Sequence, residues 1–180
     1  MKIKSLILSL VVSLGFAASA HASLLDGKVV NYQFYFPNIT NPYAGASNGT
    51  ELVGAGVEVT NLVANVGTLD ISDTNLLVAF TENGIFNPAT FSGFEITDVN
   101  NTIDAFTGVN VNALTNIVGF DASRVTFDEN HIWVNLQGLV FNKNNFVSLD
   151  VNGGTVPEPA TIALLGLGLL GFAAARRRKQ

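Results

Sequence analysis

Apolar and polar residues alternate with a period of two in two segments of the chain, a pattern that predicts β-strands. Over residues 29–36, every second position from Val30 to Phe36 is apolar or aromatic, whereas the positions between them are mixed. Residues 91–99 alternate in a similar way. Because successive side chains of a strand point to opposite faces, each segment is expected to bury one face.

Further strands are predicted from short apolar runs that end at turn-forming residues. These runs cover residues 52–63, 76–81, 109–111, 117–120, 124–127, 132–140 and 147–151. The clearest hairpin has a four-residue turn from Asp128 to His131, which places Phe127 opposite Ile132. Turn signals recur about every 8 to 12 residues, and no amphipathic helix of useful length is visible. The predicted fold is therefore an all-β, antiparallel β-sandwich rather than a barrel or a βαβ fold.

The amino-terminal residues have the pattern of an export signal. A basic start precedes the largely apolar residues 3–16, and Ala20 and Ala22 form the small-x-small pattern of a cleavage site. We therefore predict a signal peptide over residues 1–22 that is read by the secretion machinery and cut by signal peptidase. Ser23 is then the first residue of the mature chain.

The carboxyl-terminal residues combine three parts. Glu158 lies between Pro157 and Pro159, an uncharged apolar stretch covers residues 160–175, and four cations follow: Arg176, Arg177, Arg178 and Lys179. The stretch is shorter than the roughly 20 residues of a usual spanning helix, but the arginines can snorkel to extend it. Because basic residues stay cytoplasmic, we predict a transmembrane helix with a stop-transfer sequence and the larger part of the chain outside.

The order of Val156-Pro157-Glu158-Pro159-Ala160-Thr161, an apolar stretch and an arginine cluster resembles the PEP-CTERM sorting signal. The resemblance implies that an exosortase, a membrane-embedded processing enzyme, recognises Pro157, Glu158 and Pro159 and that the tail is removed. It also implies a Gram-negative bacterium that makes extracellular polysaccharide. The predicted organisation is a signal peptide (1–22), a β-sandwich domain (23–155) and the sorting signal with its membrane helix (156–180).

Residues 166–171 read Gly-Leu-Gly-Leu-Leu-Gly and match the dinucleotide-binding pattern by letter. That function needs a preceding strand and an acidic residue about 20 positions later, and this sequence has neither. Glycines in a membrane helix permit close helix packing instead, so no cofactor is predicted.

Charge and cysteine content exclude several classes of function. Residues 23–156 hold three basic and 13 acidic residues, a net charge near −10. A chain this acidic is repelled by phosphate backbones, which argues against nucleic acid as a partner. Cysteine is absent, so disulfides, thiolate-bound zinc and cysteine catalysis are excluded, and the domain depends on its own apolar core.

Residues with catalytic chemistry are sparse between the two signals. His131 is the one histidine there and lies at the end of the predicted turn, so we interpret it as a solvated loop residue. A small carboxylate-based hydrolase is kept as an alternative, because glycoside hydrolysis needs two acids at a set separation. Its candidate acids are Glu58, Glu95, Asp121, Asp128 and Glu129.

A calcium-stabilised loop is a second alternative, since exported β-domains can use carboxylate and amide oxygens in this way. The candidate ligands are Asp128, Glu129 and Asn130, or Asp70 and Asp73. Residues 98–109 start like a calcium-binding loop but lack the glycine and the final glutamate that such a loop needs. We predict neither a metal site nor an enzymatic activity.

Trp133 is the single tryptophan of the chain, and the predicted register places it on the face opposite Ile132 and Val134. An outward tryptophan can stack on a sugar ring, and the 20 asparagines of residues 23–156 supply amides that bind hydroxyl groups. Turn formation accounts for many of these asparagines. We predict a non-enzymatic exported protein of the cell surface or extracellular matrix, with a carbohydrate-binding module of the polysaccharide matrix as the alternative.

Overall fold

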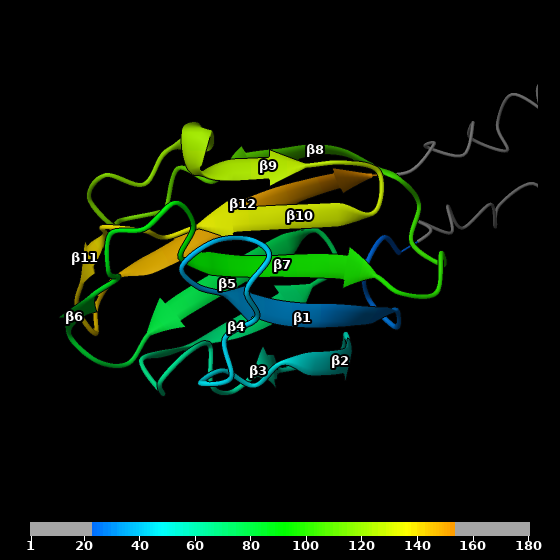
Figure 1. Ribbon diagram of the computed structural model, residues 1–180. Coiled ribbons are helices and arrows are strands. Elements are labelled where there is room, and N and C mark those ends of the chain that lie inside the picture. The colour runs from blue at the N-terminus through cyan, green and yellow to red at the C-terminus, as the bar shows by residue number, and fades with distance from the viewer. Residues whose placement is uncertain (1–22, 154–180) are drawn as a thin grey trace, which may run out of the picture. The chain divides into compact units, whose positions relative to one another are not determined.

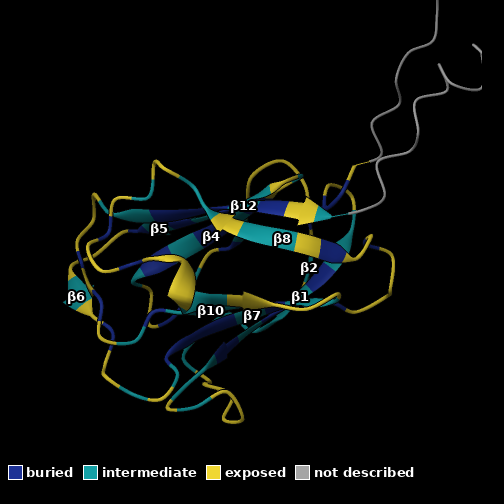
Figure 2. Cartoon of the chain, turned by 90° about the horizontal axis from the view of Figure 1, so that it is seen from above, coloured by how far each residue is buried: buried dark blue, intermediate teal, exposed yellow. Residues whose placement is uncertain are grey.

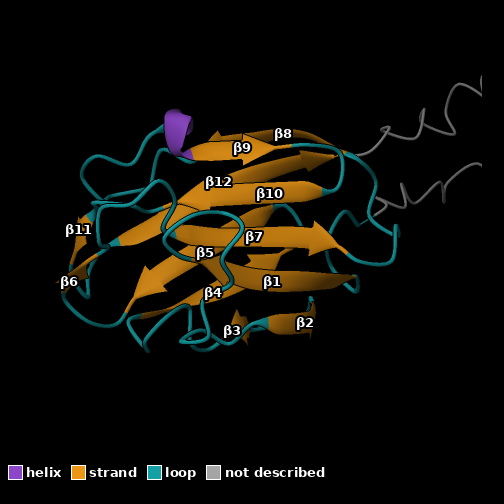
Figure 3. Ribbon diagram, in the orientation of Figure 1, coloured by secondary structure: helices purple, strands orange, loops and turns teal. Residues whose placement is uncertain are grey.

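The predicted alternation appears as twelve strands in the computed structural model, which describes residues 23–153 (Figure 1). The strands are β1 (Val29–Tyr35), β2 (Gly49–Leu52), β3 (Val57–Val59), β4 (Gly67–Ser72), β5 (Asn75–Phe80), β6 (Gly84–Ile85), β7 (Gly93–Asp98), β8 (Phe106–Val111), β9 (Val125–Phe127), β10 (His131–Asn135), β11 (Val140–Phe141) and β12 (Phe146–Gly153). One short 3₁₀-helix, η1, covers Ala122–Arg124. Figure 3 shows how completely strands and loops dominate this part of the chain.

The strands form two five-stranded sheets and one short ribbon. Sheet I has the order β2-β1-β7-β10-β9, sheet II has the order β3-β4-β5-β12-β8, and β11 pairs with β6. Every pairing is antiparallel. The prediction of an all-β antiparallel fold is confirmed, and the two stacked layers fit a β-sandwich. The predicted signal and transmembrane helices lie outside the described residues.

The core lies between the two sheets, where the buried positions gather in Figure 2. In sheet I, alternate residues of the central strands are buried, as the sequence pattern predicted, and sheet II supplies the opposing set. Both sets belong to one hydrophobic cluster that includes Val30, Phe94, Ile132, Leu69, Val78 and Leu149. Burial of apolar area at about 25 cal/mol per Å² makes this shared layer the main source of stability.

Tyr32 is the one tyrosine that is fully buried in the described domain. Its hydroxyl donates a hydrogen bond of 2.5 Å to the backbone carbonyl of Leu62, so its polar atom is satisfied inside the core. Burial raises the pKa of Tyr32 well above its ordinary value. The hydroxyl therefore stays protonated and ties the segment before β4 to the centre of sheet I.

The predicted hairpin is confirmed in its register, because Phe127 pairs with Ile132 across β9 and β10. Phe127 is nevertheless 40% exposed, since β9 is the edge strand of sheet I and little covers it. The predicted extension of the second strand to residue 140 is wrong. The strand ends at Asn135, and a turn follows in which the Leu139 N–H donates to the Leu136 carbonyl.

Two other predicted strands are also wrong. Residues 52–63 do not form one strand, because a turn containing Gly54 and Gly56 separates β2 from β3, and Gly56 has a φ of +122°. Residues 117–120 form a turn rather than a strand, with Gly119 at a φ of +85°. Leu62, Ile117 and Phe120 are buried by tertiary packing without strand pairing, a case that a periodicity argument cannot distinguish from a strand.

Gly93 provides a test of how closely the central strands β7 and β10 of sheet I approach each other. It lies at the start of β7 between Tyr35 of β1 and Asn135 of β10. A Cβ atom at this position would collide with the backbone carbonyl oxygen of Val134, which cannot move without disturbing the β7–β10 ladder. We expect Gly93→Ala to lower the free energy of unfolding by about 3 kcal/mol, near the upper end of overpacking costs.

Gly108→Ala is the matched control, because it makes the same change in a strand of sheet II. There the nearest atom to a new Cβ is Nδ2 of Asn152 at 3.4 Å, the end of a flexible side chain. Its effect should stay within about 0.5 kcal/mol. Urea denaturation followed by the fluorescence of Trp133 measures both, and equal effects of the two substitutions would contradict the proposed close approach.

Candidate functional site

The residues predicted for processing and sorting lie outside the described part of the chain. They are Ala20, Ala22, Pro157, Glu158, Pro159, Arg176, Arg177, Arg178 and Lys179. Among residues 23–153, the structure contains no helix with the length and apolar character needed to cross a bilayer.

The outer face of sheet I carries the tryptophan that the sequence singled out. On β10, Ile132 and Val134 are fully buried, whereas Trp133 is half-buried on the opposite face, as predicted from the alternation. The strand register aligns Trp133 with Glu95 of β7 and Gln33 of β1. These three residues form one row across the outer face, and we call this surface the sheet I platform.

Tyr35 adds a second aromatic ring to the sheet I platform. Its hydroxyl donates a hydrogen bond of 2.8 Å to Oε2 of Glu95. Burial raises the pKa of Tyr35 to about 12, and the hydrogen bond and charge of Glu95 act in the same direction. The tyrosine hydroxyl therefore stays protonated, and Glu95 is held in place as a hydrogen-bond acceptor between the two rings.

His131 supports Trp133 from the same face of β10. The two rings are stacked with centroids 5.1 Å apart and an interplanar angle of 15°. Nδ1 of His131 lies 2.8 Å from Oδ1 of Asp128, which also accepts the backbone N–H groups of Asn130 and His131. The interpretation of His131 as a solvated loop residue is wrong, because it begins β10, is half-buried and restrains the tryptophan ring.

Asp128 closes the turn before β10 through these contacts. The N–H of Asn130 makes the largest contribution that holds the pKa of Asp128 below its ordinary value, and His131 adds to it. No serine hydroxyl is bonded to the Asp128–His131 pair within residues 23–153. The pair therefore lacks the nucleophile that a hydrolytic triad requires.

The remaining candidate acids also have structural contacts. Glu58 accepts the backbone N–H of Gly54 at 3.0 Å and that of Ile71 at 2.6 Å, which ties the β2–β3 turn to β4. Asp121 caps η1 by accepting the N–H of Ser123 at 2.9 Å. Glu58 and Asp121 thus each accept backbone N–H groups.

Carboxylates in the loops considered for calcium also accept hydrogen bonds from backbone N–H groups. Asp73 accepts hydrogen bonds from Ser23 Oγ at 2.5 Å and from the N–H groups of Leu24 and Leu25 at 2.6 and 3.2 Å. Asp98, in the loop that resembled a calcium site, accepts the N–H groups of Asn100, Thr102 and Ile103. Over the described residues, no three His, Cys, Asp or Glu side chains gather where they could hold a metal ion.

A pocket at one end of the domain was not predicted from the sequence. Five of its eleven lining residues are aromatic, among them Phe34, Phe86 and Phe141, which are separated by about 50 residues each in the chain. The number of phenylalanines, 13 in the chain, was visible in the composition. Only the strand topology brings these particular rings together, so no local motif could have located the pocket.

Comparison with known families assigns the carboxyl-terminal residues. The fold of residues 23–153 defines an all-β antiparallel domain, and residues 155–179 match the family model of the PEP-CTERM protein-sorting motif. The chain therefore carries a PEP-CTERM sorting motif, in agreement with the resemblance noted in the sequence. The motif supports a protein that is exported, processed through an exosortase and sorted to the cell envelope of a Gram-negative bacterium. No curated protein and no solved structure matches the chain.

Asp73 gives a pH-dependent prediction. Hydrogen bonds to the carboxylate, led by that of Ser23, hold the pKa of Asp73 below its ordinary value, so the folded state favours the ionised form. This stabilisation is complete above the unfolded-state pKa, about 3.9, and is lost as the pH falls through the lower folded-state pKa. Asp73→Asn should therefore destabilise the protein at neutral pH and make little difference near pH 2 (about two units below the unfolded value).

Urea denaturation of parent and variant at several pH values measures this difference. Asp26→Asn is the matched control, because Asp26 is exposed and lies in the same segment, and its carboxylate accepts no hydrogen bond within the described residues. A difference between parent and Asp73→Asn that is constant from neutral to acid pH would contradict the role assigned to the carboxylate.

Proposed function

We propose that this protein is an exported, non-enzymatic component of the cell surface or extracellular matrix, delivered there by its carboxyl-terminal sorting signal. The observation that carries the proposal is the PEP-CTERM motif at residues 155–179, which directly follows a folded β-domain whose last strand ends at Gly153. In this scheme the secretion machinery and signal peptidase act on residues 1–22. An exosortase then recognises Glu158 between its two prolines.

The predicted membrane helix has a temporary role in this scheme. The apolar stretch of residues 160–175 holds the exported domain at the inner membrane while Arg176, Arg177, Arg178 and Lys179 stay on the cytoplasmic side. Cleavage at the motif releases the β-domain from this tether. The domain then remains at the cell surface or enters the matrix.

A non-enzymatic role agrees with the contacts of the acidic side chains. Glu58, Asp121 and Asp128 accept backbone hydrogen bonds that close turns, and Glu95 is bound by Tyr35. The aromatic pocket has no carboxylate or histidine in its lining. These arrangements supply a stable domain with polar faces, which is what a surface or matrix component requires.

Glu158→Ala tests the sorting step. Intact-mass analysis of the protein recovered from the producing cells should give a parent chain that begins at Ser23 and lacks its tail. The variant should begin at Ser23 but keep the tail, because the carboxylate between the prolines is absent. Glu129→Ala is the control, because it also replaces an acidic residue by alanine but in the β9–β10 turn. It should mature like the parent. Normal maturation of Glu158→Ala would remove the sorting role of this residue.

A second candidate function is carbohydrate binding on the sheet I platform. It is supported by two aromatic rings, Trp133 and Tyr35, on the same face as Glu95 and Gln33. Sugar rings present apolar faces that stack on aromatic rings and hydroxyl groups that bond to carboxylate and amide oxygens. The stacking of His131 behind Trp133 lowers the entropy that the tryptophan loses on binding. The acidic domain favours a neutral polysaccharide over an anionic one.

A glycan array with the mature protein tests this candidate. Parent protein should bind neutral polysaccharides, and Trp133→Ala should weaken binding by roughly 10-fold or more, because stacking on one aromatic ring contributes on the order of 1–2 kcal/mol. Phe127→Ala is the control, since Phe127 is an exposed ring on β9 outside the platform. Absence of binding, or equal binding by parent and Trp133→Ala, would remove the platform as a glycan site.

A further inference from the structure

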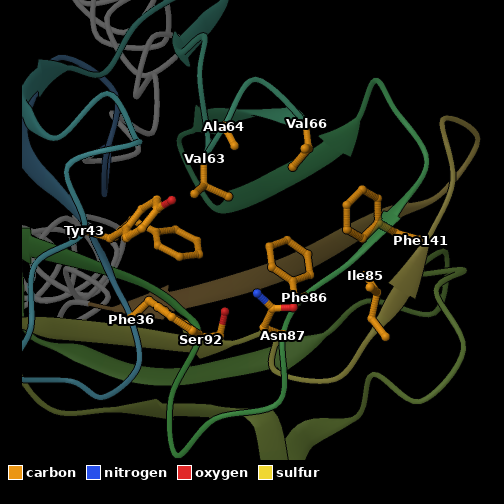
Figure 4. Close-up of a pocket in the computed structure, with 11 residues that line it drawn as sticks. Phe36, Tyr43, Val63, Ala64, Val66, Ile85, Phe86, Asn87, Ser92 and Phe141 are labelled. Carbon is orange, nitrogen blue, oxygen red and sulfur yellow. The ribbon is translucent and has the colours of Figure 1, made fainter.

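The aromatic pocket opens between the two sheets, at the end of the domain where β1 finishes and β4 begins (Figure 4). Its volume is about 170 Å³. Side chains from the end of β1, the turn before β4, the ribbon β6–β11 and the loop before β7 surround it. The pocket is therefore a feature of the assembled sandwich and not of any single loop.

The pocket has a floor of closely packed aromatic rings. Phe34 and Phe86 are stacked with centroids 6.4 Å apart, and Phe86 and Phe141 lie 4.9 Å apart. Tyr43 closes one side, with its ring edge-on to Phe34 at 6.3 Å. Aromatic pairs favour offset-stacked and edge-to-face contacts at such distances, so the floor offers favourable positions to one additional ring.

Ser92 places a hydroxyl in this apolar setting. The residue is only 3% exposed, and its Oγ makes no hydrogen bond within residues 23–153. Its backbone is fixed, because its N–H donates to Oδ1 of Asn135 and its carbonyl accepts the N–H of Leu136. In Figure 4 the hydroxyl points into the pocket. A hydroxyl that faces the pocket without a protein partner is available to bond to a polar group of a ligand.

Two further polar side chains line the pocket. The amide nitrogen of Asn87 points toward the pocket, and the side chain of Asn87 makes no hydrogen bond in the described domain (Figure 4). Tyr43 is held by its N–H, which donates to the Phe34 carbonyl at 2.8 Å, while its hydroxyl has no bonding partner in residues 23–153. No acidic or basic side chain lines the pocket, so its electrostatic character suits a neutral ligand.

The position of the pocket leaves it accessible in the exported protein. The two ends of the described chain lie together, because Gly153 packs against the side chain of Leu24. Figure 1 shows these ends at the opposite end of the domain from β6 and β11, which border the pocket. The described part of the chain therefore begins and ends on the side away from β6 and β11.

We propose that this pocket is a binding site for a small neutral molecule with one aromatic ring and one hydroxyl group, the chemistry of a simple phenol. The volume argues for a single ring, since an apolar cavity of about 150 Å³ is known to hold benzene. The floor of Phe34, Phe86 and Phe141 stacks against the ring, and Ser92 Oγ bonds to the hydroxyl. Asn87 and Tyr43 lie at the rim, where they select a polar group over a plain hydrocarbon.

Phenol and benzene are the probes, used with the full purified chain and with variants in titrations followed by ligand-observed NMR. Phenol should bind saturably with one site per chain and more tightly than benzene. Ser92→Ala should weaken phenol binding by roughly 10-fold, the effect of one buried hydrogen bond, and leave benzene binding nearly unchanged. Val66→Phe, which adds a ring to a residue that lines the pocket, should abolish binding of both probes.

Two matched controls separate binding from stability. Ser148→Ala removes a buried hydroxyl of β12 that is bonded to Asn75, and Val99→Phe adds a ring to an exposed position after β7. Both should bind phenol like the parent.

Absence of saturable phenol binding overturns the proposal, and so does binding that survives Val66→Phe. Equal phenol affinity of Ser92→Ala and the parent overturns the assigned hydroxyl contact and, with it, the preference for a phenol. None of these outcomes bears on maturation through Glu158.

Discussion

The burial of one face of each sheet against the other is the interaction on which this domain depends. The chain has no cysteine, so no disulfide restricts its unfolded state. Stability comes instead from a single apolar layer to which both sheets contribute alternate residues. The same alternation that drives these residues inward sets their neighbours outward, and it therefore determines which side chains are available for contacts with other molecules.

The polar side chains that surround this layer mostly serve the backbone. Asp73, Asp98 and Asp128 each accept several N–H groups in turns or loops, and Glu58 joins a turn to the neighbouring strand. A short strand-rich domain needs many tight connections, and carboxylates satisfy the backbone donors that the turns leave unpaired.

In two regions, side chains with polar or aromatic groups do not serve only to satisfy the backbone. On the sheet I platform, Trp133 is only half-buried although it lies in a central part of its sheet, and His131 and Asp128 fix its surroundings. In the aromatic pocket, Ser92 keeps an unpaired hydroxyl among packed phenylalanines. An exposed aromatic ring and a hydroxyl that faces a pocket without a protein partner are both available for contact with a second molecule.

The strand predictions succeeded where the sequence alternates and in the apolar runs 76–81 and 147–151, and they failed where a glycine with positive φ forms a turn. Val30 to Phe34 and Phe94 to Ile96 are buried in alternation as expected, and Phe127 pairs with Ile132. Residues 117–120 are apolar but form a turn, since Ile117 and Phe120 reach the core from a loop. Burial of an apolar residue is compatible with a strand or a loop, and only pairing partners distinguish them.

Local order in the sequence was enough to predict the sorting motif of this protein and its class of fold. Glu158 between two prolines, an apolar stretch and an arginine cluster are contiguous, and so are the alternating strands, so both can be read from local order. Tertiary structure alone decided that His131 supports Trp133 and that Phe34, Phe86, Ser92 and Phe141 meet in one pocket. The pocket contacts join residues far apart in the chain, and their geometry depends on strand order and register, which composition and spacing do not encode. His131 and Trp133 are two positions apart on β10, but the stacking of their rings is a matter of side-chain geometry that spacing alone does not give.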